Sequence, residues 1–473
     1  MTANCAVIVA KDEGEAWTLA KEAILKGAEA LEFRLDSFPV IPADLSFLAC
    51  GVPSIATLRS PLDEERKDIF LRALASGAKY IDIESDSVLR NRFPKEQVIC
   101  SYHDFEKTPA EDEILAIFND LRSSGIPKAA FMVRGPADLL AVWSAASVLR
   151  EKGAPFILIG MGAAGEVTRI RSSDLGSMLN YCALRPELAS APGQITLEEA
   201  ERLGTDPQVA AVTGYPLTHT FSPEIHNAAF KAAKIRGRYV KIPSAPEELL
   251  LIPEVIRKYR IIGMNVTIPH KESVIPFLKR IDPLAESAGA VNTIRNSPAG
   301  LEGYNTDILG IAASLASVDA DPKGAEALII GAGGAAKAAA AYLKAAGAHI
   351  SIANRTFARA ETLAELFGAR SVKIEDLKPA YTIILNATPA GMSGFEHCSP
   401  VPHTIFTKDT VVMDMIYDPE VTPLLAAAKA AGVRACINGK TMLIEQAAAS
   451  FTLWTGITPD RAVMRKAFEA RAA

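Results

Sequence analysis

The sequence lacks the features that would place the chain in a membrane or on nucleic acid. No apolar run reaches the ~18 residues that a membrane-spanning helix needs. The net charge is −5 and no block of lysine and arginine stands out, so neither a nucleic acid nor an anionic membrane is an expected partner. The short apolar run at the start has no basic lead and is unlike a signal peptide. We therefore expect a soluble, cytoplasmic protein.

Cysteine is sparse as well. Only six cysteines occur in 473 residues, and no Cys-x-x-Cys pair is among them. This pattern favours free thiols in a reducing compartment over disulfides, and it predicts no metal site. The remaining composition, 49% hydrophobic and 22% charged residues, is typical of a globular protein. The length is enough for two to four domains.

The part of the chain before residue 205 alternates short β-type runs with amphipathic helical segments. Such alternation forms right-handed crossovers and a parallel sheet, and eight strands predict a (β/α)8 barrel over residues 1–204. About 200 residues is short for this fold, so we expect one missing or misjudged helix. The predicted strands are Cys5–Ala10, Ala30–Asp36, Pro53–Arg59, Tyr80–Glu84, Val98–Tyr102, Lys128–Val133, Pro155–Gly160 and Tyr181–Leu184.

Polar residues in or just after these strands are candidate active-site groups, because the chemistry of such a barrel lies at the C-terminal strand ends. Glu32 and Arg34 lie inside an otherwise apolar strand, where an unpaired charge is costly to bury. A structural ion pair between them is the alternative interpretation. For His103, a hydrogen-bonded strand-end histidine is the alternative to an active-site role.

Lys128 begins an apolar run and also has two interpretations. It is either a solvated lysine before a strand or a desolvated lysine, whose lowered pKa would let it form a Schiff base with a ketone. The predicted strand begins at Lys128, which would put this residue at the wrong end of the barrel. Because predicted boundaries are good only to a few residues, we treat this boundary as an error of the prediction.

Four motifs occur in this region: Leu31-Glu-Phe-Arg-Leu-Asp36, Ser101-Tyr-His-Asp-Phe105, Pro127-Lys-Ala-Ala-Phe-Met132 and Ser190-Ala-Pro-Gly-Gln-Ile195. In order and spacing they resemble the type I 3-dehydroquinate dehydratases. The resemblance implies a metal-free dehydration of 3-dehydroquinate to 3-dehydroshikimate, with Lys128 as Schiff base and His103 as general base and then acid. In this family a glutamate usually stands four residues after the arginine that corresponds to Arg59. In this chain Asp63 and Glu64 are both candidates for its role, and the choice between them stays open. The implied substrate-binding residues are Glu32, Arg34, Arg59, Arg169, Ser190 and Gln194.

A second α/β pattern follows a short helical linker. We predict a substrate-binding lobe over 205–310, completed by helices within 440–473, and a Rossmann-type lobe over 311–439. The first lobe is predicted to have helices near 223–234, 246–258 and 270–279. The predicted strands are Val209–Thr213, Tyr239–Ile242, Ile261–Val266 and Ala290–Ile294, then Leu328–Ile330, His349–Ala353, Thr382–Asn386, Val411–Met415 and Val433–Ile437.

The Rossmann prediction depends on Gly331-Ala-Gly-Gly-Ala-Ala336, which ends an apolar run and opens an alanine-rich helix. This pattern is typical of dinucleotide binding, because the helix N-terminus faces the pyrophosphate. A glycine-rich turn without a ligand is the alternative. An NAD site has an acid about 20 residues further on. This chain has Asn354-Arg-Thr356 and Arg359 instead, which favours the 2′-phosphate of NADP, with a solvated helix charge as the alternative for Arg359.

Lys271 and Asp307 follow predicted strands of the first lobe. A lysine beside an aspartate suits proton transfer in the interconversion of a carbonyl and an alcohol. Taken singly, Lys271 is equally well a surface lysine, and Asp307 is equally well the N-cap of a helix.

Seven segments of this half, together with the glycine loop, resemble shikimate dehydrogenase. The segments are 214–227, 265–271, 290–293, 305–307, 354–356, 386–392 and 439–446. The resemblance implies NADPH-dependent reduction of 3-dehydroshikimate to shikimate, with Lys271 and Asp307 as the catalytic pair. Thr220 stands where the family usually has serine. The implied substrate-binding residues are Thr220, Ser222, Thr267, Asn292, Tyr417 and Gln446. The implied cofactor-binding residues are Gly331, Gly333, Gly334, Ala335, Asn354, Arg355, Thr356, Arg359, Thr388 and Gly439.

The whole sequence thus predicts an α/β protein, an N-terminal (β/α)8 barrel followed by a two-lobed dehydrogenase, that performs two consecutive steps of the shikimate pathway. Its expected partners are 3-dehydroquinate, 3-dehydroshikimate, shikimate and NADP, and either a monomer or a homodimer fits. One alternative is an NAD-dependent quinate dehydrogenase. The other is a non-catalytic metabolite sensor, which should have lost a catalytic residue; all four are present.

Overall fold

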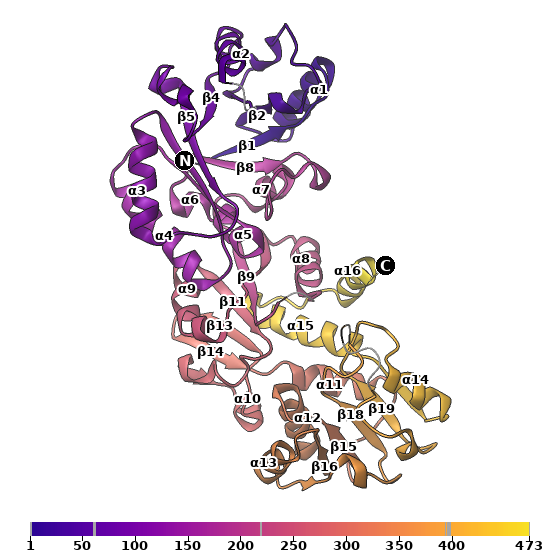
Figure 1. Ribbon diagram of the computed structural model, residues 1–473. Helices are drawn as coiled ribbons and strands as arrows, with labels where there is room; N and C mark the ends of the chain where they lie inside the picture. Colours follow the sequence, from indigo (N-terminus) through magenta and orange to yellow (C-terminus); the bar gives the residue numbers. More distant parts are fainter. Residues whose placement is uncertain (1, 60–62, 218–219, 393, 395–398, 473) are drawn as a thin grey trace. The chain divides into compact units, whose positions relative to one another are not determined.

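The computed structural model describes residues 2–59, 63–217, 220–392, 394 and 399–472 (Figure 1). The chain forms two compact units, residues 1–209 with 236–261 and residues 210–235 with 262–473. The domain boundaries at 204, 310 and 439 stay a prediction. No helix in the described ranges is long and apolar enough to cross a membrane.

The first unit contains the predicted eight parallel strands, which hydrogen-bond in the order β7-β6-β5-β4-β3-β2-β1-β8. Across the described residues no ladder joins β7 to β8, and the backbone N–H of Met178 donates to the carbonyl of Phe156 (2.8 Å) just before these two strands. The barrel is therefore nearly closed. The strands are β1 (Ala3–Ile8), β2 (Ala30–Arg34), β3 (Ser54–Thr57), β4 (Tyr80–Glu84), β5 (Val98–Asp104), β6 (Ile126–Met132), β7 (Ile157–Met161) and β8 (Leu179–Ala183).

Helices cover the outside of these strands wherever the sequence carries an apolar stripe. In α3, Ile114, Phe118 and Leu121 recur at helical spacing and are buried. Two crossovers, between β2 and β3 and between β4 and β5, contain only 3-10 turns, so helices are indeed missing from a full barrel. The helices are α1 (Glu13–Leu25), α2 (Asp63–Ala75), α3 (Glu111–Arg122), α4 (Pro136–Glu151), α5 (Gly162–Ile170), α6 (Ser172–Leu175) and α7 (Leu197–Leu203).

The next part of the chain forms a mixed sheet of order β10-β9-β11-β13-β14-β12. The predicted helix over 270–279 is wrong: turns and a short 3-10 helix (Ile275–Phe277) occupy it, because Pro269 and Pro276 interrupt helical hydrogen bonding. The predicted strand Ala290–Ile294 lies a few residues further on, in a hairpin that was not predicted. The strands are β9 (Gln208–Thr213), β10 (Gly237–Lys241), β11 (Ile261–Val266), β12 (Arg280–Ile281), β13 (Thr293–Ser297) and β14 (Gly300–Tyr304). The helices are α8 (Ser222–Ala232), α9 (Ile252–Lys258) and α10 (Pro283–Ala288).

The last sheet is parallel throughout, in the order β17-β16-β15-β18-β19-β20. Its order reverses between β15 and β18, which is where Rossmann folds bind dinucleotides. The five predicted strands are confirmed, and only the two-residue β17 was missed. They are β15 (Glu326–Ile330), β16 (His349–Ala353), β17 (Arg370–Ser371), β18 (Ile383–Asn386), β19 (Val411–Asp414) and β20 (Ala435–Ile437).

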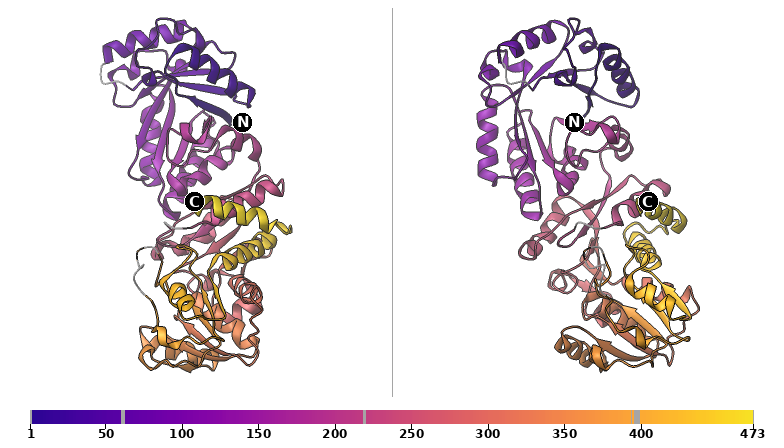
Figure 2. Two further views of the ribbon diagram at one scale, coloured as in Figure 1. Left: turned by 90° about the vertical axis from the view of Figure 1, so that its right-hand side faces the viewer. Right: turned by 45° about the vertical axis from the view of Figure 1, so that its right-hand side comes forward.

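Six helices belong to this part of the second unit. The C-terminal helices α15 and α16 contact each other and α8, and α15 also packs against α11 (Figure 2). This packing brings residues from the end of the chain beside the strand ends of the mixed sheet. The helices are α11 (Asp307–Ala316), α12 (Gly334–Ala345), α13 (Phe357–Phe367), α14 (Pro423–Ala430), α15 (Lys440–Thr455) and α16 (Arg461–Ala472).

Within the first unit, a buried arginine holds the segment 236–261. Arg171, 2% exposed, donates hydrogen bonds to the carbonyls of Tyr259 (3.1 Å) and Arg260 (3.2 Å). Its guanidinium also lies 3.5 Å from a carboxylate oxygen of Asp174 and 3.3 Å from one of Asp206. Two backbone carbonyls thus depend on one side chain.

We expect Arg171→Met to lower the free energy of unfolding by about 2–4 kcal/mol, because the buried carbonyl of Tyr259 and the partly buried carbonyl of Arg260 lose their donor. Urea unfolding measures the change. Arg257→Met is the matched control, since the Arg257 side chain is 67% exposed and its pair with Glu254 contributes little. Equal losses in the two variants would contradict the anchoring role of Arg171.

Candidate active sites

Lys128 lies inside the barrel and is fixed by two carboxylates. It is the third residue of β6, so the boundary drawn at Lys128 was wrong by two residues. Its side chain is 5% exposed, which excludes the solvated interpretation. The ammonium nitrogen is 2.8 Å from Oδ2 of Asp82 and 3.6 Å from Oε1 of Glu32, and it lies 4.1 Å from the centre of the Tyr181 ring. The buried positive charge is therefore compensated.

Asp82, which was not predicted from the sequence, is the centre of this cluster. It is fully buried in β4 and accepts hydrogen bonds from Lys128, from Nη2 of Arg59 (2.7 Å) and from the hydroxyl of Ser101 (2.6 Å). Burial alone would raise the pKa of Asp82, but the charges of Arg59 and Lys128 hold it well below its usual range. Asp82 is thus an ionised carboxylate shared by two cations.

Glu32 and Arg34 do not pair with each other, but each takes part in an ion pair with another residue. Oε1 of Glu32 accepts a hydrogen bond from the hydroxyl of Thr57 (2.8 Å) and faces Lys128. Arg34 forms a bidentate pair with Asp36, at 3.0 and 2.6 Å. The two side chains thus belong to separate contacts.

His103, at the end of β5, is held as a neutral imidazole. Burial lowers its pKa to about 3, and the positive charges of Lys128 and Arg59 act in the same direction, against the opposing effect of Asp82. Its ring stacks on Phe105, with ring centres 5.9 Å apart. A neutral imidazole beside a lysine can accept a proton, as a general base must.

Arg169, Ser190 and Gln194 meet at one point of β8. Nη1 of Arg169 (3.2 Å) and Nε2 of Gln194 (3.3 Å) both donate to the carbonyl of Tyr181. Oε1 of Gln194 accepts from the backbone N–H and the hydroxyl of Ser190 (2.8 and 3.2 Å). Arg169 is 4% exposed and has no ion-pair partner among the described residues, and burial lowers its pKa to about 10. Such a guanidinium suits an anionic group of a ligand. The side chains of Asp63 and Glu64 lie outside the described part.

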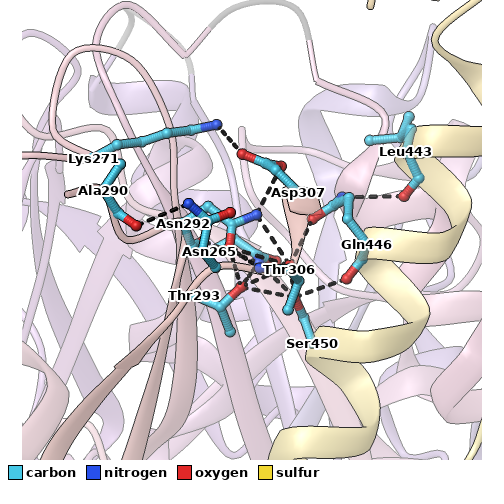
Figure 3. Close-up of polar contacts among 11 residues, drawn as sticks. Asn265, Lys271, Ala290, Asn292, Thr293, Thr306, Asp307, Leu443, Gln446 and Ser450 are labelled. Atoms are coloured by element: carbon cyan, nitrogen blue, oxygen red, sulfur yellow. Dashed lines mark hydrogen bonds and ion pairs between the residues drawn. The ribbon is translucent and has the colours of Figure 1, made fainter. Parts of the chain in front are cut away.

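In the second unit, Lys271 and Asp307 form the predicted pair. The ammonium nitrogen of Lys271 lies 2.5 Å from Oδ2 of Asp307, and Nδ2 of Asn292 donates to Oδ1 at 2.8 Å (Figure 3). Lys271 is only 14% exposed, so it is not a surface lysine. The N-cap of α11 is Thr306, so Asp307 is not the cap. The carboxylate is therefore free to orient the lysine.

A buried hydroxyl network supports this pair from behind. Oδ1 of Asn292 accepts from the N–H of Thr306 (2.8 Å), whose hydroxyl contacts Ser450 (3.1 Å) and Oε1 of Gln446 (3.4 Å). Figure 3 shows Gln446 and Ser450 on one face of α15, pointing toward Thr306. Asn292 and Gln446 were predicted, whereas Thr306 and Ser450 were not. The spacing of four residues from Gln446 to Ser450 is the signal that could have found the latter.

The glycine loop between β15 and α12 packs directly on this site. Gly331 has φ +115, and a Cβ there would lie 3.0 Å from the carbonyl of Ala387 and from Cγ2 of Thr388. A Cβ on Gly334 would lie 2.9 Å from Cδ of Lys271, whereas one on Gly333 would meet nothing within 4 Å. The loop thus has open space at Gly333, the N-cap of α12, and the backbone N–H groups of a helix N-terminus suit a pyrophosphate.

The other predicted cofactor residues are distributed around this loop. Nδ2 of Asn354 donates to the carbonyl of Thr356 (2.9 Å), and Arg355 and Arg359 are exposed, with no protein partner in the described ranges. Ala335 lies in the first turn of α12. A Cβ on Gly439 would overlap the carbonyl of Met415, so this glycine is needed for a close backbone approach.

Four predicted substrate residues have no contact with Lys271 or Asp307 in the part of the chain that the structure describes. The hydroxyl of Thr220 accepts from the N–H of Ser222 (3.3 Å), and Thr267 directly follows β11. Tyr417 packs its ring against Phe221, with centres 5.3 Å apart, and burial raises its pKa to about 12. The roles of Thr220, Ser222, Thr267 and Tyr417 in substrate binding stay predictions.

Comparison with known families covers both units. Residues 4–205 match the type I 3-dehydroquinase family. Residues 212–294 match the shikimate dehydrogenase substrate binding domain, residues 314–395 match shikimate / quinate 5-dehydrogenase, and residues 439–467 match the shikimate 5′-dehydrogenase C-terminal domain.

Individual relatives agree with these matches. The chain is 30% identical to the chloroplastic bifunctional 3-dehydroquinate dehydratase/shikimate dehydrogenase of Arabidopsis thaliana, over 91% of this chain and 78% of that protein. It is 41% identical to shikimate dehydrogenase (NADP(+)) of Carboxydothermus hydrogenoformans, over 56% of this chain and 98% of that protein. The crystal structure of Thermus thermophilus shikimate 5-dehydrogenase with NADP(H) and shikimate matches 56% of this chain and 100% of its own, with 36% identity and a TM-score of 0.52.

The barrel with its buried lysine and the Rossmann-type unit with its lysine–aspartate pair define a fused lyase and oxidoreductase. The chain belongs to the bifunctional 3-dehydroquinate dehydratase/shikimate dehydrogenase family. Both resemblances that the motifs predicted are thereby confirmed, and the chain is a bifunctional enzyme of the shikimate pathway.

We expect Asp82→Asn to slow turnover in the dehydratase reaction at least ~100-fold, because Lys128 and Arg59 lose the charge that orients them. The amide keeps the shape of the carboxylate. Formation of the conjugated product, followed by absorbance, measures the effect. The dehydrogenase activity of the same preparation should be unchanged, as should the dehydratase activity of Asp120→Asn, whose carboxylate is 61% exposed. Full dehydratase activity in Asp82→Asn would rule out this role.

Proposed function

We propose that Lys128 performs the dehydration of 3-dehydroquinate as a Schiff base, and that Lys271 with Asp307 performs the NADPH-dependent reduction of 3-dehydroshikimate to shikimate. The observation that carries the first assignment is the position of Lys128, inside the barrel and between Asp82 and Glu32. The 2.5 Å pair between Lys271 and Asp307 carries the second.

In the dehydratase, the amine of Lys128 adds to the substrate ketone and becomes an iminium, which acidifies the neighbouring C–H bond. His103, neutral at pH 7, accepts this proton and returns it to the departing hydroxyl. Arg169, Ser190 and Gln194, which meet at the Tyr181 carbonyl, bind the substrate carboxylate. Glu32, Arg34 and Arg59 position its hydroxyls.

In the dehydrogenase, Lys271 donates a proton to the carbonyl oxygen, and Asp307 keeps the ammonium group oriented and charged. Asn292 holds Asp307, and Gln446, Thr220, Ser222, Thr267 and Tyr417 bind the substrate. When bound, NADPH supplies the hydride. Gly331, Gly333, Gly334, Ala335, Thr388 and Gly439 shape its pyrophosphate and nicotinamide region, and Asn354, Arg355, Thr356 and Arg359 bind the 2′-phosphate.

Three further assignments belong to the proposal. The barrel ends near residue 204, the substrate lobe near 310 and the Rossmann lobe near 439, with the C-terminal helices completing the substrate lobe. The protein works in the cytoplasm, in keeping with the free thiols of Cys5, Cys50, Cys100, Cys182 and Cys436. It acts on small molecules as a monomer or homodimer.

We expect the purified protein to convert 3-dehydroquinate to shikimate when NADPH is added, and borohydride with substrate to trap an adduct on Lys128. Lys128→Ala should abolish dehydration and trapping but still reduce 3-dehydroshikimate. Lys271→Met should abolish the reduction of 3-dehydroshikimate but still dehydrate 3-dehydroquinate and be trapped on Lys128, because its barrel is unchanged. NADPH oxidation measures the reduction, and mass spectrometry detects the adduct on Lys128. An adduct that persists in Lys128→Ala would refute the Schiff-base role, and no NADPH oxidation with either ketone would refute the whole proposal.

We expect the double variant Arg355→Ala with Arg359→Ala to raise the KM for NADPH at least ~10-fold, because two cations that face the 2′-phosphate are lost. The KM for NADH, which lacks this phosphate, should change less than about twofold. Arg370→Ala is the control, since Arg370 is exposed at the start of β17, away from the strand ends that bear the loop. A KM that rises equally for both cofactors would exclude 2′-phosphate recognition.

A further inference from the structure

Tyr181 of β8 is a buried residue of the barrel whose hydroxyl has no partner. Its ring is part of the interior cluster and the residue is 5% exposed. Among the described residues, none forms a hydrogen bond with its oxygen. Burying an unpaired hydroxyl is unfavourable, and phenylalanine would fill the same space without that cost. A hydroxyl kept at such a position indicates a partner that arrives with the substrate.

The ring of Tyr181 lies against the reacting nitrogen. Nζ of Lys128 is 4.1 Å from the ring centre, while Asp82 and Glu32 contact the same nitrogen. A cation over an aromatic face is stabilised by the ring quadrupole, and more strongly when water is excluded. This stabilisation acts on the ammonium group and equally on an iminium formed from it.

We propose that Tyr181 is a further catalytic residue of the dehydratase site. Its ring stabilises the cationic nitrogen of Lys128, and its hydroxyl donates a hydrogen bond to the oxygen on the substrate carbon that this nitrogen attacks. The inference depends on the Schiff-base role proposed for Lys128.

The chemistry requires a donor at this place. When the amine adds to the ketone, the carbonyl oxygen becomes a hydroxyl on the carbon bonded to Nζ. This carbon–oxygen bond then breaks and the nitrogen lone pair forms the C=N bond of the protonated iminium. The oxygen leaves as water with the proton that His103 had taken from the ammonium group of Lys128 before the addition. The departing oxygen is bonded to the carbon that Nζ attacks, and Nζ lies 4.1 Å from the centre of the ring that carries this hydroxyl, which is the basis for assigning the hydroxyl as the donor.

Tyr181 keeps its own proton during this step. Burial raises the pKa of the phenol well above its usual range, and the charges of Glu32 and Asp82 raise it further, so the group acts as a hydrogen-bond donor and not as an acid. The side chain of Tyr181 therefore stabilises both the leaving oxygen, through its hydroxyl, and the iminium cation, through its ring.

Tyr259 provides a matched control within the same unit. It too is fully buried, but its hydroxyl donates to the carbonyl of Leu139 at 2.8 Å. Removing this hydroxyl breaks a structural hydrogen bond, whereas removing that of Tyr181 breaks none in the described protein. The two Tyr→Phe substitutions should therefore have opposite effects on stability and on turnover.

The experiment compares Tyr181→Phe, Tyr181→Leu and Tyr259→Phe in the full chain, by dehydratase kinetics, melting temperature and the rate of borohydride trapping. We expect Tyr181→Phe to keep or raise the melting temperature, to lower kcat about 10- to 100-fold and to change KM less than about threefold. Tyr181→Phe should also slow trapping, because the hydroxyl assists the step that forms the iminium, and Tyr181→Leu, which lacks the ring as well, should slow trapping further. Tyr259→Phe should lower the melting temperature and leave kcat unchanged.

If kcat is unchanged in Tyr181→Phe while the wild-type protein is trapped on Lys128, the proposed hydrogen bond from Tyr181 is wrong. The Schiff-base role of Lys128 would not be affected by that result. Trapping of Tyr181→Leu at the same rate as Tyr181→Phe would overturn the role of the ring. A wild-type protein that dehydrates its substrate but is never trapped on Lys128 would instead overturn the mechanism on which the inference depends. Reduction of 3-dehydroshikimate shows in each variant that the preparation is intact.

Discussion

The buried carboxylate of Asp82 is the group on which the arrangement of the barrel site depends. Lys128, Arg59 and Ser101 all donate to it, so one anion fixes a nucleophile, a cation and a hydroxyl before any substrate is present. Asp307 has the same relation to Lys271 and Asn292 in the second unit. Two unrelated folds thus orient a lysine with a buried aspartate.

The sequence predicted most of the fold and both lysines, but it did not predict Asp82. The run Tyr80-Ile-Asp-Ile-Glu84 has the alternation of a strand with one polar face, and alternation does not tell which face is inside. In this barrel Ile81 and Ile83 are buried under the helices, whereas Asp82 points inward, where two cations compensate its charge. That compensation comes from Arg59, just after β3, and from Lys128 in β6, and the local sequence pattern does not reveal it.

The local errors have equally specific causes. A helix was predicted near 270–279, yet Pro276 removes a backbone donor within this segment, and turns with a short 3-10 helix form instead. The hairpin of β13 and β14 was missed although Ser297-Pro-Ala-Gly300 has the composition of a turn. Thr306 and Ser450 were missed because the contact between them joins α15 to the start of α11 across 144 residues.

The absence of a side chain on Gly334 has a consequence for the position of Lys271. A Cβ at this glycine would lie 2.9 Å from Cδ and 3.1 Å from Cβ of Lys271, closer than such atoms pack. The glycine loop and the lysine that pairs with Asp307 therefore fit together only because this position carries no side chain. A single methyl group here would push the lysine away from its carboxylate.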